Sequence, residues 1–274
     1  MHVPRLPDWL VYGTVLAALV LAAHGRRERE DAPSAPPPPP GLAQAPIAPG
    51  SPFAADRVAP VPRRAASAAG TAFSVDERGL WLTAGHVING CGQVGLVVAE
   101  GRGVAARVLA RRGDLAVLQS EGGAPGLPLA GADWPVRGEQ LFQPGYPQGA
   151  AGEVAARMMG RQTLGGGGRG GAPQTLMALV EDGRTEGLGE SFSGLSGAPV
   201  LDEAGRVVGV TLGQSPRRGR LYAAPPELMA QALAAAGARP AAGPAAPLAV
   251  DDYGRVADAL RRDLRVVQVV CLAG

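Results

Sequence analysis

The strongest constraint on the fold is a series of short apolar runs separated by glycine and acidic residues. From about residue 66 onward the runs are rich in valine, leucine and alanine. They are predicted as strands at 71–75, 80–83, 94–98, 104–109, 115–119, 153–159, 176–181, 199–201 and 206–212. Hairpin turns are predicted at 76–79 and 202–205. Many short strands at close spacing indicate an all-β sandwich or barrel.

The N-terminal region has a different composition. An apolar run from Leu10 to Ala23 fits the hydrophobic part of an export signal. Its fourteen residues fall short of a membrane span, although an extension to Leu6–His24 gives a marginal one. Whether residues 1–24 are a cleaved signal peptide or a signal-anchor helix stays open, and we favour the anchor. Three arginines follow the run and one precedes it, which conflicts with the usual charge rule for such an anchor.

Composition divides the remainder into four segments. Residues 25–60 are a Pro/Ala-rich linker with a polyproline run, which is extended and cannot bury a core. Residues 61–238 are the folded domain, and its last part, 225–236, is predicted as a helix. Residues 239–249 form a second linker. Residues 250–274 are a C-terminal extension, predicted as a helix at 252–264 and a strand at 265–271.

The chain contains no lysine, because all 26 of its basic residues are arginine. This excludes sites that need a lysine, such as the phosphate-binding P-loop, the Ser-Lys hydrolases and the pyridoxal Schiff base. Only three histidines (His2, His24 and His86) and two cysteines are present, so we expect no metal site. No cofactor is expected. A net charge of +2 gives no reason to expect a nucleic-acid partner.

Three local sequences carry the residue types of nucleophilic catalysis. They are Leu82–Ile88 (LTAGHVI), Gly113–Leu118 (GDLAVL) and Gly194–Val200 (GLSGAPV). A serine hydroxyl needs an imidazole to take its proton, and the imidazole needs a carboxylate to orient it. Ser196, His86 and Asp114 are therefore the candidate catalytic residues. The N–H groups of Gly194 and Ser196 are the candidate oxyanion-hole donors.

These motifs, in the order His, Asp, Ser, resemble the chymotrypsin/trypsin-like serine proteases, and within them the HtrA (Deg) type without a PDZ domain. The forms T-A-x-H-V, D-L-A-V-L and G-x-S-G-x-P-V carry the resemblance, which covers about residues 66–236. It implies a double β-barrel with His86 and Asp114 on the first barrel, Ser196 on the second, and the site in the cleft between them. An α/β-hydrolase is excluded because its histidine follows the serine, and none follows Ser196 here.

The resemblance also implies substrate-binding residues. Glu190, six residues before Ser196, has the place of the residue at the bottom of the trypsin S1 pocket, where a carboxylate favours Arg or Lys. The alternative is a solvated loop acid. Strand 208–213 resembles the strand that pairs with substrate, which makes Val210, Thr211, Leu212 and Gly213 candidates. Residues 222–225 resemble the strand that closes the second barrel.

The two cysteines, Cys91 and Cys271, suggest one disulfide in an exported chain. This placing of the two cysteines resembles that in bacterial trypsin-like proteases, which have one cysteine just after the histidine segment and another in a final strand. The bridge would tie residues 250–274 to the first barrel. Two separate buried thiols are the alternative.

The combined features predict an exported serine endopeptidase that cleaves protein or peptide substrates through an acyl-enzyme. We expect it in the bacterial periplasm or at the cell surface, anchored in the inner membrane by its N-terminus, or secreted if the signal is cleaved. One alternative is a catalytically inactive, protease-like peptide-binding domain on a membrane stalk. Another is a purely structural periplasmic domain.

Overall fold

The computed structural model describes residues 51–61, 66–165, 173–215 and 219–272. The predicted signal segment, 1–24, and residues 25–50 of the predicted linker lie outside the described residues. The chain divides into two units, Met1–Pro46 and Ile47–Gly274, and the described residues all belong to the second. None of the helices in the described ranges is both long and apolar enough to span a membrane.

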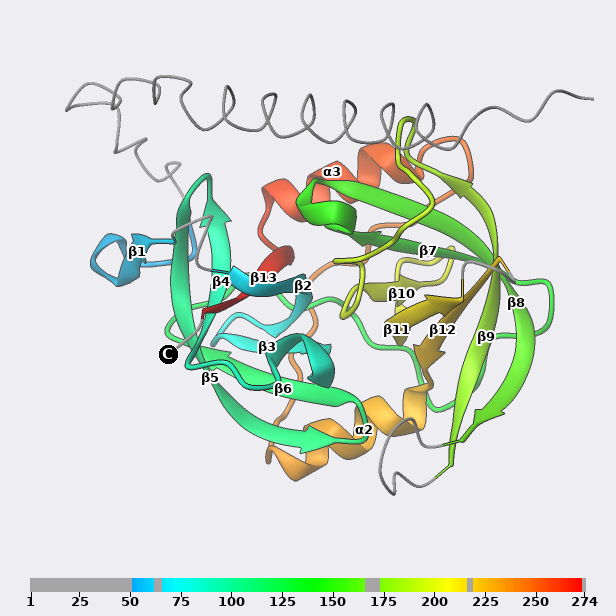
Figure 1. Cartoon of the computed structure of the whole chain (residues 1–274), viewed down its shortest axis with the longest axis horizontal. Coiled ribbons are helices and arrows are strands. Elements are labelled where there is room, and N and C mark those ends of the chain that lie inside the picture. Colours follow the sequence, from blue (N-terminus) through cyan, green and yellow to red (C-terminus); the bar gives the residue numbers. More distant parts are fainter. Residues whose placement is uncertain (1–50, 62–65, 166–172, 216–218, 273–274) are drawn as a thin grey trace, which may run out of the picture. The chain divides into compact units, whose positions relative to one another are not determined.

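The first barrel is a closed antiparallel ring of described strands (Figure 1). In chain order they are β2 (Ala66–Asp76), β3 (Leu80–Ala84), β4 (Gln93–Ala99), β5 (Arg102–Arg112), β6 (Leu115–Ser120) and β13 (Val266–Leu272). The ring runs β5-β4-β13-β2-β3-β6 and closes because β5 also pairs with β6. A short strand, β1 (Val58–Pro60), follows the turn Ala55–Arg57 and pairs with β5 from outside. The core contains fully buried side chains of Phe73, Trp81, Leu82, Leu96 and Leu118.

The second barrel closes in the order β10-β11-β12-β9-β8-β7. Its strands are β7 (Gln140–Gly145), β8 (Gly152–Leu164), β9 (Gln174–Arg184), β10 (Pro199–Leu201), β11 (Val207–Ser215) and β12 (Arg220–Ala224). Leu141, Val154, Leu179 and Val200 are among the side chains of a separate hydrophobic core. The all-β double barrel expected from the sequence is therefore confirmed. Strand β7 was not among the predicted strands.

The C-terminal residues are part of the first barrel. Helix α2 (Pro226–Ala235) packs on β5 and β6 after the second barrel, and α3 (Tyr253–Arg262) then leads into β13. Strand β13 inserts between β4 and β2, with Val269 opposite both Leu96 and Gly70 (Figure 1). The predicted helix-strand extension is present, and its strand is a member of the ring. The segment before it is also attached, because the N–H of Gly243 donates to Gly126 O at 2.8 Å.

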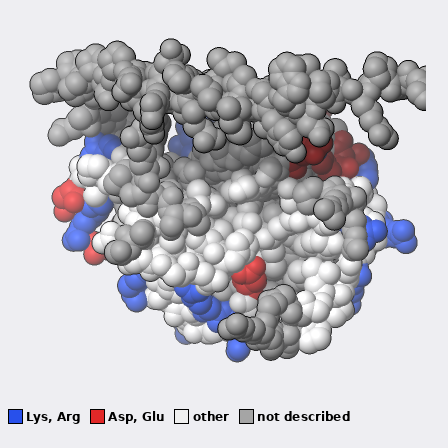
Figure 2. All heavy atoms as spheres, viewed as in Figure 1, with Lys and Arg blue, Asp and Glu red and all other residues white. Residues whose placement is uncertain are grey.

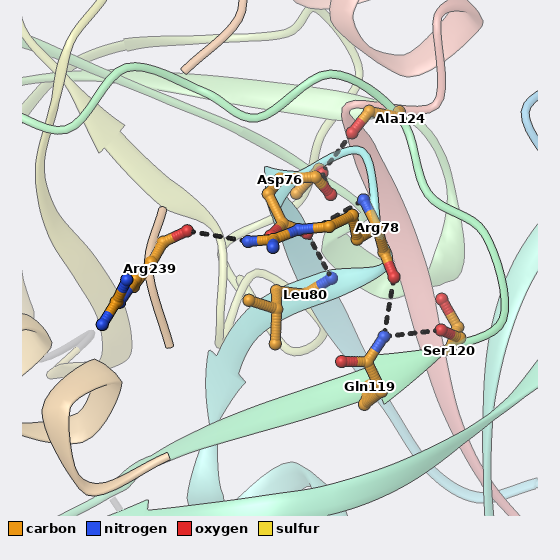
Figure 3. A network of polar contacts seen from close by, with 8 residues as sticks. Asp76, Arg78, Leu80, Gln119, Ser120, Ala124 and Arg239 are labelled. Carbon is orange, nitrogen blue, oxygen red and sulfur yellow. Dashed lines mark hydrogen bonds and ion pairs between the residues drawn. The ribbon is translucent and has the colours of Figure 1, made fainter. Parts of the chain in front are cut away.

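Both predicted hairpin turns are built on a buried aspartate paired with an arginine. In the turn 76–79, Asp76 Oδ1 accepts the N–H groups of Arg78 and Leu80, and Oδ2 accepts the Arg78 guanidinium at 2.7 Å (Figure 3). The same guanidinium donates to Arg239 O at 3.1 Å, which ties the hairpin to the segment after α2. In the turn 202–205, Asp202 accepts both the N–H and the guanidinium of Arg206. In both turns, backbone N–H groups satisfy one carboxylate oxygen and the guanidinium satisfies the other, which makes these buried acids tolerable.

On the face shown in Figure 2, the arginine and acidic side chains stand in small groups among uncharged residues. Several are paired on the surface, such as Arg57 with Glu121 and Arg157 with Asp182. Exposed pairs of this kind add little stability.

Cys91 and Cys271 form a disulfide with an S–S distance of 2.02 Å. It joins the segment that follows His86 to the end of β13, across 180 residues of sequence. A cross-link over so long a loop restricts the unfolded chain strongly in the entropic model.

We predict that replacing both cysteines, Cys91→Ser with Cys271→Ser, lowers the free energy of unfolding by about 2–5 kcal/mol. Urea denaturation followed by tryptophan fluorescence measures this. As a control, the unmodified chain under reducing conditions should unfold at the same urea concentration as the variant. Identical unfolding midpoints for the variant and the oxidised chain would contradict the prediction.

Candidate active site

His86 and Asp114 are brought together where two strand ends of the first barrel meet. His86 lies in the short helical turn Gly85–Ile88 directly after β3, and Asp114 lies in the turn between β5 and β6. The N–H of Gly85 donates to Asp114 O at 2.9 Å, and the N–H of His86 donates to Asp114 Oδ1 at 2.8 Å. These two backbone bonds fix the carboxylate beside the imidazole.

The imidazole is oriented by the other carboxylate oxygen. His86 Nδ1 is 2.7 Å from Asp114 Oδ2. An ionised carboxylate only accepts hydrogen bonds, so Nδ1 carries the proton in the neutral ring and Nε2 holds a free lone pair. The His86 side chain is 43% exposed. The pair can therefore act as an oriented general base.

Ser196 lies in a tight turn just before β10 of the second barrel. The turn is closed by the N–H of Leu195, which donates to Phe192 O at 2.9 Å. Gly194 has φ +95°, and a Cβ there would lie 2.4 Å from Tyr146 O. Only glycine combines this backbone conformation with so close an approach. The turn thus requires the glycine of the sequence motif.

The Ser196 hydroxyl points to β11 in this structure. Ser196 Oγ donates to Leu212 O at 3.2 Å. Within the described residues it makes no hydrogen bond to His86. The structure brings the three predicted residues to one junction between the barrels but does not join the serine to the base.

The turn is held from the first barrel by Thr71 of β2. The N–H of Thr71 donates to Ser196 O at 2.8 Å, and Thr71 Oγ1 donates to Gly194 O at 2.8 Å. The same oxygen accepts the N–H of Tyr146 at 3.1 Å. Sequence reasoning missed Thr71, because a threonine in a predicted strand carries no motif.

The peptide between Ser193 and Gly194 has a defined orientation. Ser193 O accepts the N–H of Gln148 at 2.5 Å. In a planar trans peptide the N–H points away from the C=O, so the Gly194 N–H faces the side opposite Gln148. Among the described residues, neither the Gly194 N–H nor the Ser196 N–H donates to another protein group. Both predicted donors are thus free to bind an anionic oxygen.

Only part of the predicted substrate strand has a backbone edge that is open to a substrate. Val210 and Thr211 are buried and paired with β12, and Thr211 also exchanges hydrogen bonds with Gly197 and Ala198. Their backbone is already used, so the structure does not place these two at an open edge. Among the described strands, β10 pairs with no residue of β11 beyond Val210, which leaves Leu212–Ser215 as an edge beside Ser196. Leu212 and Gly213 remain candidates for contact with a substrate.

Glu190 lies in the wall of a pocket of about 310 Å³. The pocket is lined by Glu181, Arg184, Glu190, Phe192, Gln214, Gly219, Arg220 and Leu221. The Gln214 amide holds the 190–192 segment of this wall, because Oε1 accepts the N–H of Phe192 at 2.9 Å and Nε2 donates to Glu190 O at 3.3 Å. Sequence reasoning did not identify Gln214. Glu190 itself is exposed.

In the described ranges, no group of three or more His, Cys, Asp or Glu side chains could hold a metal ion.

Comparison with known proteins gives one family match. Residues 70–210 match the trypsin-like peptidase domain. The active form of the Rv3671c protease from M. tuberculosis has a TM-score of 0.54 and 22% identity, over 77% of this chain and 97% of that one. The inactive form of that protease has a TM-score of 0.53 and 24% identity, over 63% of this chain and 86% of that one. The HtrA-type protease AlgW with a decapeptide has a TM-score of 0.50 and 21% identity, over 61% of this chain and 51% of that one. A search of curated proteins returned no match.

We predict that Gly194→Ala distorts the turn and lowers the free energy of unfolding by about 1–3 kcal/mol. The added methyl group would meet the backbone oxygen of Tyr146, and alanine is strained at this φ. Thermal unfolding measures the loss. Gly138→Ala is the matched control, because Gly138 also has positive φ (+88°) but nothing lies within 4 Å of its Cβ position. Equal losses in the two variants would show that the contact with Tyr146 is unimportant.

Proposed function

This chain belongs to the trypsin-like peptidase family, and from that we propose that it is a serine endopeptidase acting through His86, Asp114 and Ser196. The observation that carries the proposal is the 2.7 Å pairing of His86 Nδ1 with Asp114, beside a glycine turn with two free N–H groups. An oriented base, a nucleophile and an oxyanion site are the parts that acyl transfer requires.

In the proposed reaction, Ser196 Oγ attacks the carbonyl carbon of the scissile bond. His86 Nε2 takes the hydroxyl proton, and Asp114 stabilises the resulting imidazolium. The N–H groups of Gly194 and Ser196 bind the oxyanion of the tetrahedral intermediate. His86 then gives the proton to the leaving amine, which forms the acyl-enzyme. Water, deprotonated by His86, hydrolyses the acyl-enzyme and restores the serine.

This sequence needs one local adjustment. The Ser196 hydroxyl must leave Leu212 O and turn to His86 Nε2. Rotation of a side chain between staggered positions is fast, and the hydrogen bond that it gives up contributes about 1 kcal/mol. A substrate whose backbone N–H takes over Leu212 O would favour the change.

We further propose how a substrate binds. An extended peptide pairs with the open edge Leu212–Gln214 by adding a strand to the second barrel. The side chain before the scissile bond enters the pocket lined by Glu190 and Gln214. Glu190 would attract an arginine or lysine there, while Arg184 and Arg220 in the same pocket weaken that attraction.

Export is also a proposal. The apolar N-terminal run with its linker supports an exported chain tethered to the inner membrane, with the domain on the periplasmic side. The disulfide between Cys91 and Cys271 supports it independently, because such bonds persist in oxidising compartments.

A fluorophosphonate probe tests the nucleophile. We expect the wild-type chain to be labelled covalently and the Ser196→Ala variant to remain unlabelled, because the reagent forms a bond to an activated serine oxygen. Mass spectrometry of the labelled peptide locates the site. Ser51→Ala is the control, since Ser51 lies before β1, away from this turn, and should leave labelling unchanged. Wild-type protein that is folded but unreactive would rule out the proposed activity.

We predict that His86→Ala removes nearly all activity, with a fall in kcat on the order of 10⁴–10⁶-fold. His86 is the single histidine after residue 24, and the chain has no lysine, so no second base of these types can replace it. Single-turnover acylation by an active ester measures the effect. A fall smaller than about tenfold would indicate that another group activates the serine.

A second function has one observation in its favour. The Ser196 hydroxyl is bonded to Leu212 O and not to His86, as expected for an inactive, protease-like domain that binds peptides without cleaving them. This alternative predicts saturable peptide binding with no probe labelling. The probe experiment therefore separates the two functions.

A further inference from the structure

Arg261, in the last turn of α3, is a charged side chain buried between the C-terminal helix and the second barrel. Only 7% of its side chain is exposed. Its guanidinium donates to Glu153 Oε2 at 2.8 Å and to Asp258 Oδ1 at 2.7 Å. Burial opposes the charge, but the hydrogen bonds to Asp258 and Glu153 outweigh it and raise the pKa of Arg261. The group is therefore a permanent, fully engaged cation.

The same guanidinium bridges the base of the loop between β7 and β8. Nη1 donates to Gly152 O at 3.1 Å and to Gly145 O at 3.4 Å. Gly145 and Gly152 are the last pair of residues in the β7–β8 hairpin. Arg261 thus holds both ends of the loop that contains residues 146–151.

This loop contacts the turn that carries Ser196. The Gln148 N–H donates to Ser193 O at 2.5 Å, and the Tyr146 N–H donates to Thr71 Oγ1, which in turn donates to Gly194 O. The first of these bonds sets which way the peptide between Ser193 and Gly194 faces. A loop that moved away would release this peptide, and the Gly194 N–H would no longer be held toward an oxyanion.

We infer that Arg261 is a positioning residue for the oxyanion hole, so that the C-terminal helix controls the reactivity of Ser196 through the 146–151 loop. The inference rests on the proposed serine-protease function. Arg261 touches no reacting atom. Its role is to hold Gly145 and Gly152, and thereby the bond from Gln148 to Ser193.

The test compares variants of the full-length chain by their second-order rate constant for reaction with a fluorophosphonate probe. The main variant is Arg261→Met with Glu153→Gln, because removing the arginine alone would leave Glu153 as an unpaired buried charge. Loss of one oxyanion donor lowers rates about 10²–10³-fold, so we expect at least a tenfold fall. Arg255→Met is the matched control, since Arg255 lies on the same helix in an exposed pair with Asp252 and should leave the rate unchanged.

Two further measurements separate positioning from mere stability. The NMR resonance of the His86 Nδ1 proton should stay unchanged, because the His86–Asp114 pair does not depend on the loop. Arg261→Lys keeps a charge for Glu153 but cannot bridge both glycine carbonyls, so it should react at an intermediate rate. If the double variant does not fold, the lysine variant alone decides the outcome.

One result would contradict the inference, and another would contradict the proposed function beneath it. If the variants unfold at a lower temperature but react at the wild-type rate while folded, Arg261 only stabilises the fold and the inference is wrong. A wild-type chain that is folded yet unreactive would instead remove the proposed function on which the inference rests.

Discussion

The geometry of the turn that carries Ser196 depends on one buried hydroxyl, Thr71 Oγ1, which belongs to the opposite barrel. It accepts the N–H of Tyr146 and donates to Gly194 O, while the Thr71 backbone holds Ser196 O. A hydroxyl can donate and accept together, so one side chain satisfies two buried backbone groups. The proposed base and nucleophile lie on separate barrels, and such a site needs a junction of this kind, because displacements near 1 Å lower reaction rates greatly. The pairing of β13 with β2 then supports Thr71 from the other side, where Gln268 lies opposite it.

Much of the fold and the positions of the three candidate residues could be predicted, because their signals are local. His86, Asp114 and Ser196 each stand at a strand end within a short motif. Strand β7 was missed because its sequence ends in Pro144 and Gly145, which usually mark a loop. Strand β13 was predicted, but not its place in the ring. Its partners β2 and β4 are distant in the sequence, and no local pattern identifies them. The same holds for Thr71, whose hydrogen bond to Gly194 spans 123 residues.

The absence of lysine shapes the fold as well as the chemistry. Asp76 and Asp202 are buried in hairpin turns, and in each the arginine that follows satisfies the carboxylate with more than one N–H. Arg261 extends this use, because its guanidinium reaches two carboxylates and two carbonyl oxygens. A lysine has one nitrogen on a flexible stem and could not span these acceptors. Arginine at these three positions therefore satisfies buried acceptors that lysine would leave in part unpaired.

The orientation of the Ser196 hydroxyl and the conformation of its turn carry different weight for function. The hydroxyl can rotate from Leu212 O on a fast timescale and at the loss of a single hydrogen bond. The turn is restrained by the bond from Gln148 to Ser193 and by the close approach of Gly194 to Tyr146 O, so its change requires the 146–151 loop to move. A change of the turn is consequently slower than rotation of the hydroxyl, and the conformation of the turn says more about function. If Arg261 has the inferred role, helix α3, and not the group formed by His86, Asp114 and Ser196, decides whether the protein cleaves a peptide or only binds it.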